Sequence, residues 1–99
     1  MRIISKRRLR EFWVFHPQAE SALPAWYKVV NEATWPNFAE LRLTFPSADQ
    51  VGRLVVFNVS GNRYRLVALV DYQWQKIFIR GVMPHAEYSK GDWKDDPWF

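Results

Sequence analysis

Three neighbouring side chains near the end of the chain are of types that transfer protons. Between Pro84 and Tyr88, His85 supplies an imidazole, Glu87 a carboxylate and Tyr88 a phenol. An imidazole gains and loses a proton near neutral pH, so His85 is a candidate general acid or base. Tyr88 is a candidate for proton transfer or for stacking on a nucleobase. Glu87 carries a charge that repels phosphate, so we expect it to cap a terminal turn.

Arg65 and Arg80 are the candidate phosphate-binding groups, and the predicted strands decide whether they meet. Three runs, Leu54 to Val59, Tyr64 to Asp71 and Lys76 to Met83, are rich in β-branched and aromatic residues. Gly61-Asn62 predicts a tight turn between the first two runs, which therefore form a hairpin. The third run follows after a short loop and is expected to pair with the second.

The hairpin registers predict which residues face one another. Pairing Ser60 with Arg63 places Asn58 opposite Arg65, and pairing Asp71 with Lys76, as a local ion pair, places Arg65 opposite Val82. Arg65 and Arg80 then occupy diagonal positions, whose backbones lie roughly 7 to 8 Å apart. We therefore expect the two guanidinium groups to converge on one phosphate, with no acid placed opposite either.

Alternation along the three strands divides their side chains between two faces. The face expected to carry the helices has Phe57, Tyr64, Leu66, Ala68, Val70, Ile77, Ile79 and Met83. The other face has Asn58, Arg65, Asp71, Lys76 and Arg80 among Val56, Val67, Leu69, Phe78 and Val82. This second face is the candidate functional surface.

The first half of the chain predicts helices that support this sheet. Met1 to Ile4 is a short apolar strand, and Ser5 caps a helix that Pro17 ends. The apolar stripes, expected to be core, are Leu9, Phe12, Trp13 and His16, then Leu23, Trp26, Tyr27 and Val30, and then Phe38 and Leu41 after an Asn37 cap. Pro24 marks a kink or a first turn, and His16 is expected to pack rather than react. Helices before strands indicate an α+β domain.

Composition narrows the class of protein. Ninety-nine residues make one domain, residues 1–99, and 48% hydrophobic residues supply a core. The chain has no cysteine and two histidines, so we expect neither a metal centre nor a cofactor. No apolar run reaches the roughly 20 residues of a membrane span, and we expect a soluble, cytoplasmic protein.

Charge favours a polyanionic partner. Fourteen Lys and Arg against ten Asp and Glu give a net charge of +4. Residues 1–10 carry five cations and no acid, and residues 50–85 carry five cations against Asp71 alone. A solvated basic face explains the charge as well as nucleic-acid binding does, so charge leaves both open.

Several segments resemble one family. The stretch Val56 to Val67 (VFNVSGNRYRLV) and the stretch Ile79 to Tyr88 (IRGVMPHAEY) resemble the HigB family of RelE-like toxins from bacterial type II toxin–antitoxin modules. The segments His16 to Glu20, Ala25 to Tyr27 and Phe45 to Asp49 resemble that family's helical half, so the match covers nearly the whole chain. The resemblance implies a RelE-like fold and an mRNA interferase that cleaves messages, typically at the ribosome. It also implies a HigA-type antitoxin as partner.

The chemistry of metal-free RNA cleavage suggests roles for the candidate residues. The 2′-hydroxyl must lose a proton, the phosphorane charge must be stabilised and the 5′-oxygen must gain a proton. Arg65 and Arg80 suit the phosphorane, and His85 and Tyr88 suit the proton transfers. The residues expected to contact RNA are Lys6, Arg7, Arg8, Arg10, Asn58, Arg63 and Lys76.

Two other functions stay open, and so does the tail. A non-catalytic RNA- or ribosome-binding module needs no His85, and a small DNA-binding regulator would use the basic helix, although no helix-turn-helix pair is recognisable. The acidic, aromatic tail Gly91 to Phe99 is expected to fray or to cover apolar surface with Trp93 and Trp98. Alternatively, its aspartates lie near Arg65 and Arg80 and compete with RNA.

Overall fold

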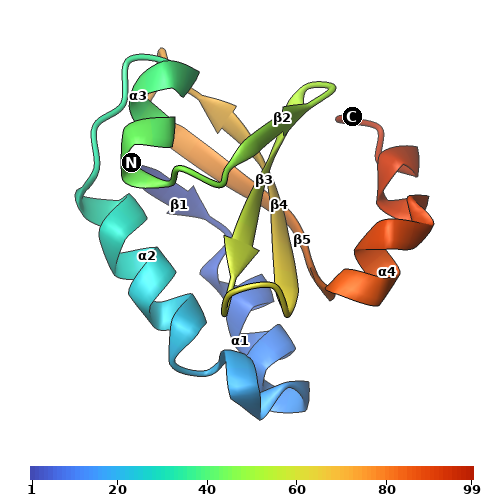
Figure 1. The fold of residues 1–99 in the computed structure, drawn as a ribbon. Helices are drawn as coiled ribbons and strands as arrows, with labels where there is room; N and C mark the ends of the chain where they lie inside the picture. Colours follow the sequence, from blue (N-terminus) through green and yellow to red (C-terminus); the bar gives the residue numbers. More distant parts are fainter.

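The computed structural model describes residues 1–99 and consists of a five-stranded sheet between two unequal layers. The elements are β1 (Arg2–Ile4), α1 (Lys6–Phe15), η1 (Pro17–Ala19), α2 (Ala22–Glu32), α3 (Phe38–Thr44), β2 (Asp49–Val51), β3 (Leu54–Val59), β4 (Tyr64–Asp71), β5 (Lys76–Pro84), α4 (His85–Lys90) and η2 (Asp92–Asp95). Helices α1 to α3 cover one face of the sheet, and α4 lies on the other (Figure 1). The predicted α+β class is confirmed.

The sheet is antiparallel except at one edge. Its strand order is β1-β5-β4-β3-β2, and β1 runs parallel to β5. The sequence pattern predicts β1, β3, β4 and β5, but it misses β2, which continues the loop after Pro46 into a short edge strand. None of the helices is both long enough and apolar enough to span a lipid bilayer.

The helix boundaries that the sequence marks are found in the structure. Ser5 precedes α1, Pro17 follows it in η1, and Pro24 lies in the first turn of α2, where a missing N–H costs little. Asn37 caps α3 by accepting the Glu40 N–H at 2.9 Å. His16 packs, as expected, and its ring stacks on Phe12 with 4.2 Å between ring centroids.

The main core lies between the helices and the sheet. Leu9, Leu23, Trp26, Val30 and Leu41 of the helices pack against the predicted apolar face, which contributes Phe57, Tyr64, Leu66, Ala68, Ile77 and Ile79. Trp13 and Phe38 are half-buried against this core. A second apolar cluster occupies the other face, where Leu54, Val56, Val67 and Met83 are covered by Tyr88, Trp93, Trp98 and Phe99. The tail is therefore part of the packed structure.

A β-bulge changes the predicted register of β5. The β3–β4 pairs Asn58–Arg65 and Phe57–Leu66 are confirmed, as are Asp71–Lys76 and Leu69–Phe78 between β4 and β5. The register shifts between Val67 and Ala68, whose partners are Gly81 and Ile79, so Arg80 is the extra residue.

The bulge makes two predictions wrong. Arg65 lies opposite Met83, not Val82, and the two β5 residues exchange faces. Met83 joins the second cluster and Val82 packs against the main core, because a one-residue slip reverses every later side chain.

The ion pair predicted between Asp71 and Lys76 is also wrong, since Asp71 instead accepts the Trp74 N–H at 3.1 Å.

Candidate active site

Arg65 is the only charged side chain in the buried set, with 8% of its surface exposed. Its position on β4 points it to the face that α4 covers. Nη2 donates to Oδ1 of Asn62 at 2.8 Å, and Nη1 donates to the backbone oxygens of Tyr64 at 3.1 Å and Asn62 at 3.5 Å. Strand alternation places Arg65 on the face away from the N-terminal helices and does not predict its burial, which follows from the packing of α4 and the tail on that face.

No carboxylate neutralises Arg65. The ion pairs of the structure are Arg7–Glu11 and Arg80–Asp96. A guanidinium has five N–H donors. Three of the five in Arg65 make hydrogen bonds, namely both N–H groups of Nη1 and one N–H group of Nη2. Nε and one N–H of Nη2 make no hydrogen bond within the chain, so they remain as donors for an anion such as a phosphate. Arg65 is thus a buried cation whose hydrogen bonds within the chain all go to neutral oxygens.

Helix α4 brings Tyr88 to Arg65 and places His85 beside Tyr88. It starts after Pro84, where the His85 N–H donates to the Arg63 backbone oxygen at 2.9 Å and fixes α4 to the start of β4. The Arg65 guanidinium carbon lies 5.7 Å from the Tyr88 ring centroid, within reach of a cation–π contact. The Tyr88 and His85 ring centroids are 6.5 Å apart.

His85 and Tyr88 differ in their surroundings. His85 is exposed, and its Nδ1 lies 3.2 Å from the Ser89 hydroxyl. Tyr88 is half-buried and stacks on Trp93 with 5.0 Å between ring centroids. Burial raises the pKa of the Tyr88 phenol and the charge of Asp49 raises it further, against the opposing effect of Arg65. Tyr88 is therefore protonated at neutral pH and available as a donor.

Arg80 lies on the same face as Arg65 but has other partners. Its Nε and Nη2 donate to the two carboxylate oxygens of Asp96 at 3.0 and 3.2 Å, and its guanidinium lies 4.0 Å from the Trp98 ring centroid. Burial alone would raise the pKa of Asp96, but hydrogen bonds from Arg80 and from the Trp98 N–H, with the charges of Arg80 and Arg8, hold this pKa below its ordinary value. The strands place no acid opposite Arg80, and its carboxylate partner, Asp96, comes from the tail, as the alternative expectation for the tail predicts.

The bulge also separates the two arginines. Arg65 lies opposite Met83, so Arg80 is three strand residues away, roughly 10 Å along the backbone. A cavity of about 420 Å³ lies beside Arg80, between β5 and the tail, and Trp93, Asp92 and Asp96 form part of its wall. The two arginines lie on the same face of the sheet but have no hydrogen-bond partner in common.

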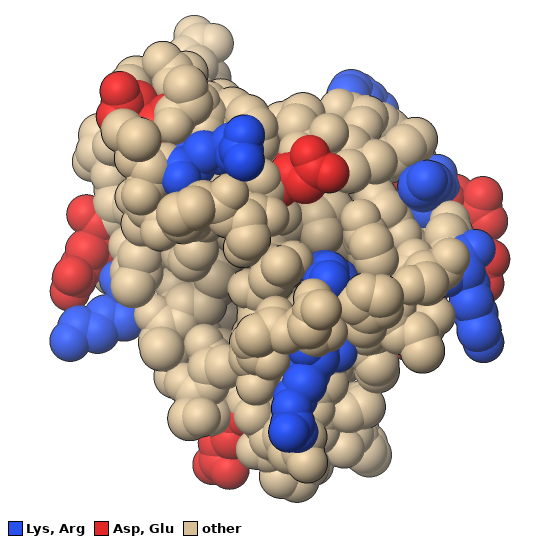
Figure 2. Space-filling view, viewed as in Figure 1, with Lys and Arg blue, Asp and Glu red and all other residues tan.

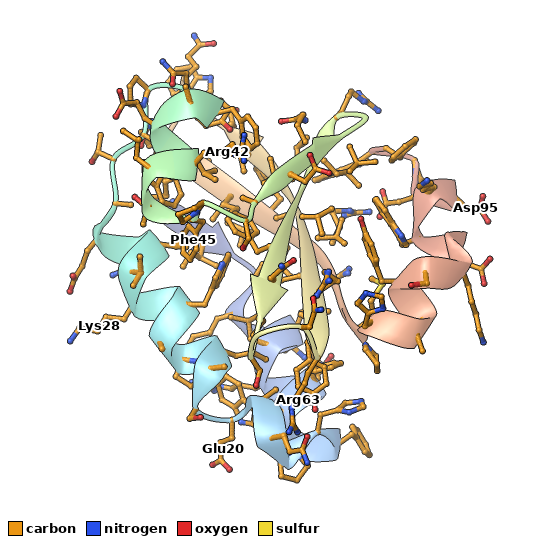
Figure 3. The ribbon with its side chains drawn as sticks, viewed as in Figure 1. Glu20, Lys28, Arg42, Phe45, Arg63 and Asp95 are labelled. Carbon is orange, nitrogen blue, oxygen red and sulfur yellow. The ribbon has the colours of Figure 1, made fainter.

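Most of the other predicted RNA contacts lie away from the Arg65 cluster. Arg63 lies in the β3–β4 turn and donates to the side chain of Gln18 in η1. Figure 3 labels Arg63, and Figure 2 shows basic side chains at the surface there. Asn58 pairs with Arg65 across the hairpin, whereas Lys76 lies at the opposite end of β5.

The cations of α1 form a separate group. Arg8 is the one that reaches the candidate face, since its Nη1 donates to the Arg80 backbone oxygen at 2.7 Å. Arg7 pairs with Glu11 at 2.8 Å, Lys6 lies 4.6 Å from the Tyr27 ring centroid, and Arg10 is exposed. Nowhere in residues 1–99 do three His, Asp or Glu side chains group as metal ligands would.

Sequence reasoning misses two contributors to the site. Asn62 is expected only to form a turn, yet it holds Arg65, and its place three residues before the arginine is the signal that points to it. Trp93 is expected near the core, and no pattern indicates that it stacks on Tyr88.

Comparison with known proteins decides the family. Residues 19–91 match the model of the HigB toxins, described as the RelE-like toxic component of a toxin–antitoxin system. The chain belongs to the HigB toxin family. The HigB match spans α2 through α4, and so contains Arg65, Arg80, His85 and Tyr88.

Curated relatives agree over nearly the whole chain. The mRNA interferase toxin HigB of Escherichia coli K12 is 35% identical over 92 residues, which cover 90% of this chain and 88% of the relative. The mRNA interferase HigB of Shigella flexneri gives the same figures, and that of Escherichia coli O6:H1 is 31% identical over 93 residues, covering 91% and 90%. The expected family is therefore confirmed.

Proposed function

We propose that this HigB toxin cleaves mRNA at the Arg65 face, without a metal ion and on the ribosome. The HigB family consists of toxins from toxin–antitoxin systems, and the curated relatives of this chain are named mRNA interferases. The observation that carries the proposal is the buried Arg65 guanidinium, which has no carboxylate partner and whose Nε makes no hydrogen bond within the chain. A buried charge without a counter-ion costs stability, so its retention is best explained by an anionic ligand.

The proposed chemistry follows from the cluster around this charge. Arg65 stabilises the phosphorane, whose charge develops during attack by the 2′-hydroxyl. His85, exposed beside the Tyr88 ring, exchanges a proton with the 2′-hydroxyl or the 5′-oxygen. Tyr88 is protonated at neutral pH, so it donates a hydrogen bond or stacks on a nucleobase. It does not act as the general base.

Arg80 is proposed as a second phosphate ligand that the tail holds until RNA arrives. The Asp96 carboxylate accepts from Nε and Nη2 of Arg80, and a phosphate can accept from the same two donors. In the proposal an RNA phosphate replaces Asp96 on Arg80, and the cations of α1, with Arg8 nearest, bind flanking phosphates.

The partners and place of action complete the proposal. A toxin of this family has an antitoxin partner, for which we propose a HigA-type protein. mRNA on the ribosome is the proposed substrate, which sets the site of action in the cytoplasm. Lys6, Arg7, Arg8, Arg10 and Arg63 are proposed to contact RNA, because phosphate contacts by such exposed cations position a protein on nucleic acid.

Analysis of the cleavage products tests the proposal. Purified protein is mixed with ribosomes programmed with a defined mRNA, and the new ends are identified. Attack by the 2′-hydroxyl leaves a 2′,3′-cyclic phosphate and a 5′-hydroxyl, and a 2′-deoxy substitution at the cut site stops cleavage. Ends with a 3′-hydroxyl and a 5′-phosphate would instead indicate metal-activated water. Binding without any cleavage would support the non-catalytic module.

A further inference from the structure

The β3–β4 turn holds the guanidinium of Arg65 through a single side chain. Asn62 accepts from Nη2 with its amide oxygen at 2.8 Å and from Nη1 with its backbone oxygen at 3.5 Å. The turn is shaped for this, because Ser60 and Gly61 have φ of 55° and 63° and so bring Asn62 back over the start of β4.

The type of residue at this position matters for the charge of the site. An aspartate would offer an oxygen at the same place, but it would also form an ion pair with Arg65 and neutralise it. The amide orients the guanidinium, which stays fully positive and keeps its Nε donor without a partner in the chain.

We infer that Asn62 is a positioning residue, which aims Arg65 at an RNA phosphate without neutralising its charge. This inference rests on the proposed function of Arg65. Asn62 itself is exposed and takes no part in the apolar core, so its contact with Arg65 is its main interaction within the fold.

Two substitutions separate aiming from folding. Asn62→Asp keeps the oxygen and adds the charge, so the protein should unfold at the same or a higher urea concentration, yet cleave programmed ribosomes at least tenfold more slowly. Asn62→Ala removes the oxygen and should lower kcat several-fold with little change in KM or in the unfolding midpoint. Asn31→Ala, an exposed asparagine on α2, is the matched control and should behave as wild type.

The outcomes distinguish this inference from the proposed function. A folded Asn62→Asp protein with the wild-type cleavage rate would overturn the inference. If Arg65→Lys also cleaves at the wild-type rate, the proposed function fails with it. If Arg65→Lys is inactive while Asn62→Asp is fully active, only the positioning by Asn62 is wrong.

Discussion

The carboxylate of Asp96 lies across the guanidinium of Arg80, with one oxygen 3.0 Å from Nε and the other 3.2 Å from Nη2. Both side chains are about one-fifth exposed, and Trp98 packs over the pair. The two tail hypotheses drawn from the sequence are therefore not exclusive. The aromatic residues cover the second apolar cluster, and one aspartate meets a proposed phosphate ligand.

Asp96→Asn should bind RNA more tightly than wild type. The neutral amide holds Arg80 less firmly, so a phosphate displaces it more easily, and we expect a several-fold lower Kd with a steeper dependence on salt. Filter binding or anisotropy with a 2′-deoxy-substituted, uncleavable RNA measures this. Asp95→Asn changes charge equally at an exposed position of the same tail and is the control. Equal affinities for the two variants would show that Asp96 does not compete with RNA.

Trp93→Ala should destabilise the fold. Trp93 is half-buried, packs on the second cluster and stacks on Tyr88, so its removal should cost roughly 1–3 kcal/mol of unfolding free energy. Urea denaturation followed by circular dichroism provides the measurement. Trp74→Ala, at a tryptophan that is 67% exposed, should change stability by about half a kcal/mol or less. Equal small effects at both positions would mean that the tail is not packed in solution.

Asp96 should make stability fall at acid pH. Its pKa is lower in the folded protein than in the unfolded chain, so its contribution is complete above the unfolded pKa, near 4, and is lost as the pH falls through the folded pKa. Unfolding midpoints measured from pH 6 to pH 2 should therefore fall more steeply for wild type than for Asp96→Asn. Parallel curves would argue against the ion pair.

Tyr88→Phe should keep the fold and weaken cleavage. The ring still packs on Trp93, but the hydroxyl donor is lost, so we expect an unchanged unfolding midpoint and a reduced kcat. In a spectrophotometric titration, the difference between wild type and Tyr88→Phe should show a phenol that ionises above pH 10, because burial and Asp49 raise its pKa. A phenol that ionises below pH 10 would contradict the buried position of Tyr88.

The sequence predicts local structure well because helix caps, apolar stripes and the hairpin turn are set by neighbouring residues. Asn37, Pro24 and the Asn58–Arg65 pairing are examples. The bulge at Arg80 is different, since alternation does not reveal it and the adjacent Gly81 is the local feature that points to it. Alternation therefore predicts the wrong faces for Val82 and Met83.

The candidate site depends more on tertiary contacts. Arg65 and Tyr88 are recognisable as types, but the burial of Arg65 depends on how α4 and the tail return over the sheet. The Arg80–Asp96 pair joins residues 16 positions apart, and nothing in the strand pattern indicates which of the tail's acids Arg80 meets.

Arg65→Met tests the central claim most directly. The substitution replaces a buried cation that has no counter-ion with an apolar side chain of comparable length, so the claim is that function, not folding, requires the charge. The measurement is the rate at which the folded variant cleaves mRNA on programmed ribosomes, with its urea unfolding midpoint taken alongside. We expect a midpoint no lower than wild type and cleavage reduced by about a hundredfold or more. A folded Arg65→Met protein that cleaves at the wild-type rate would contradict the account.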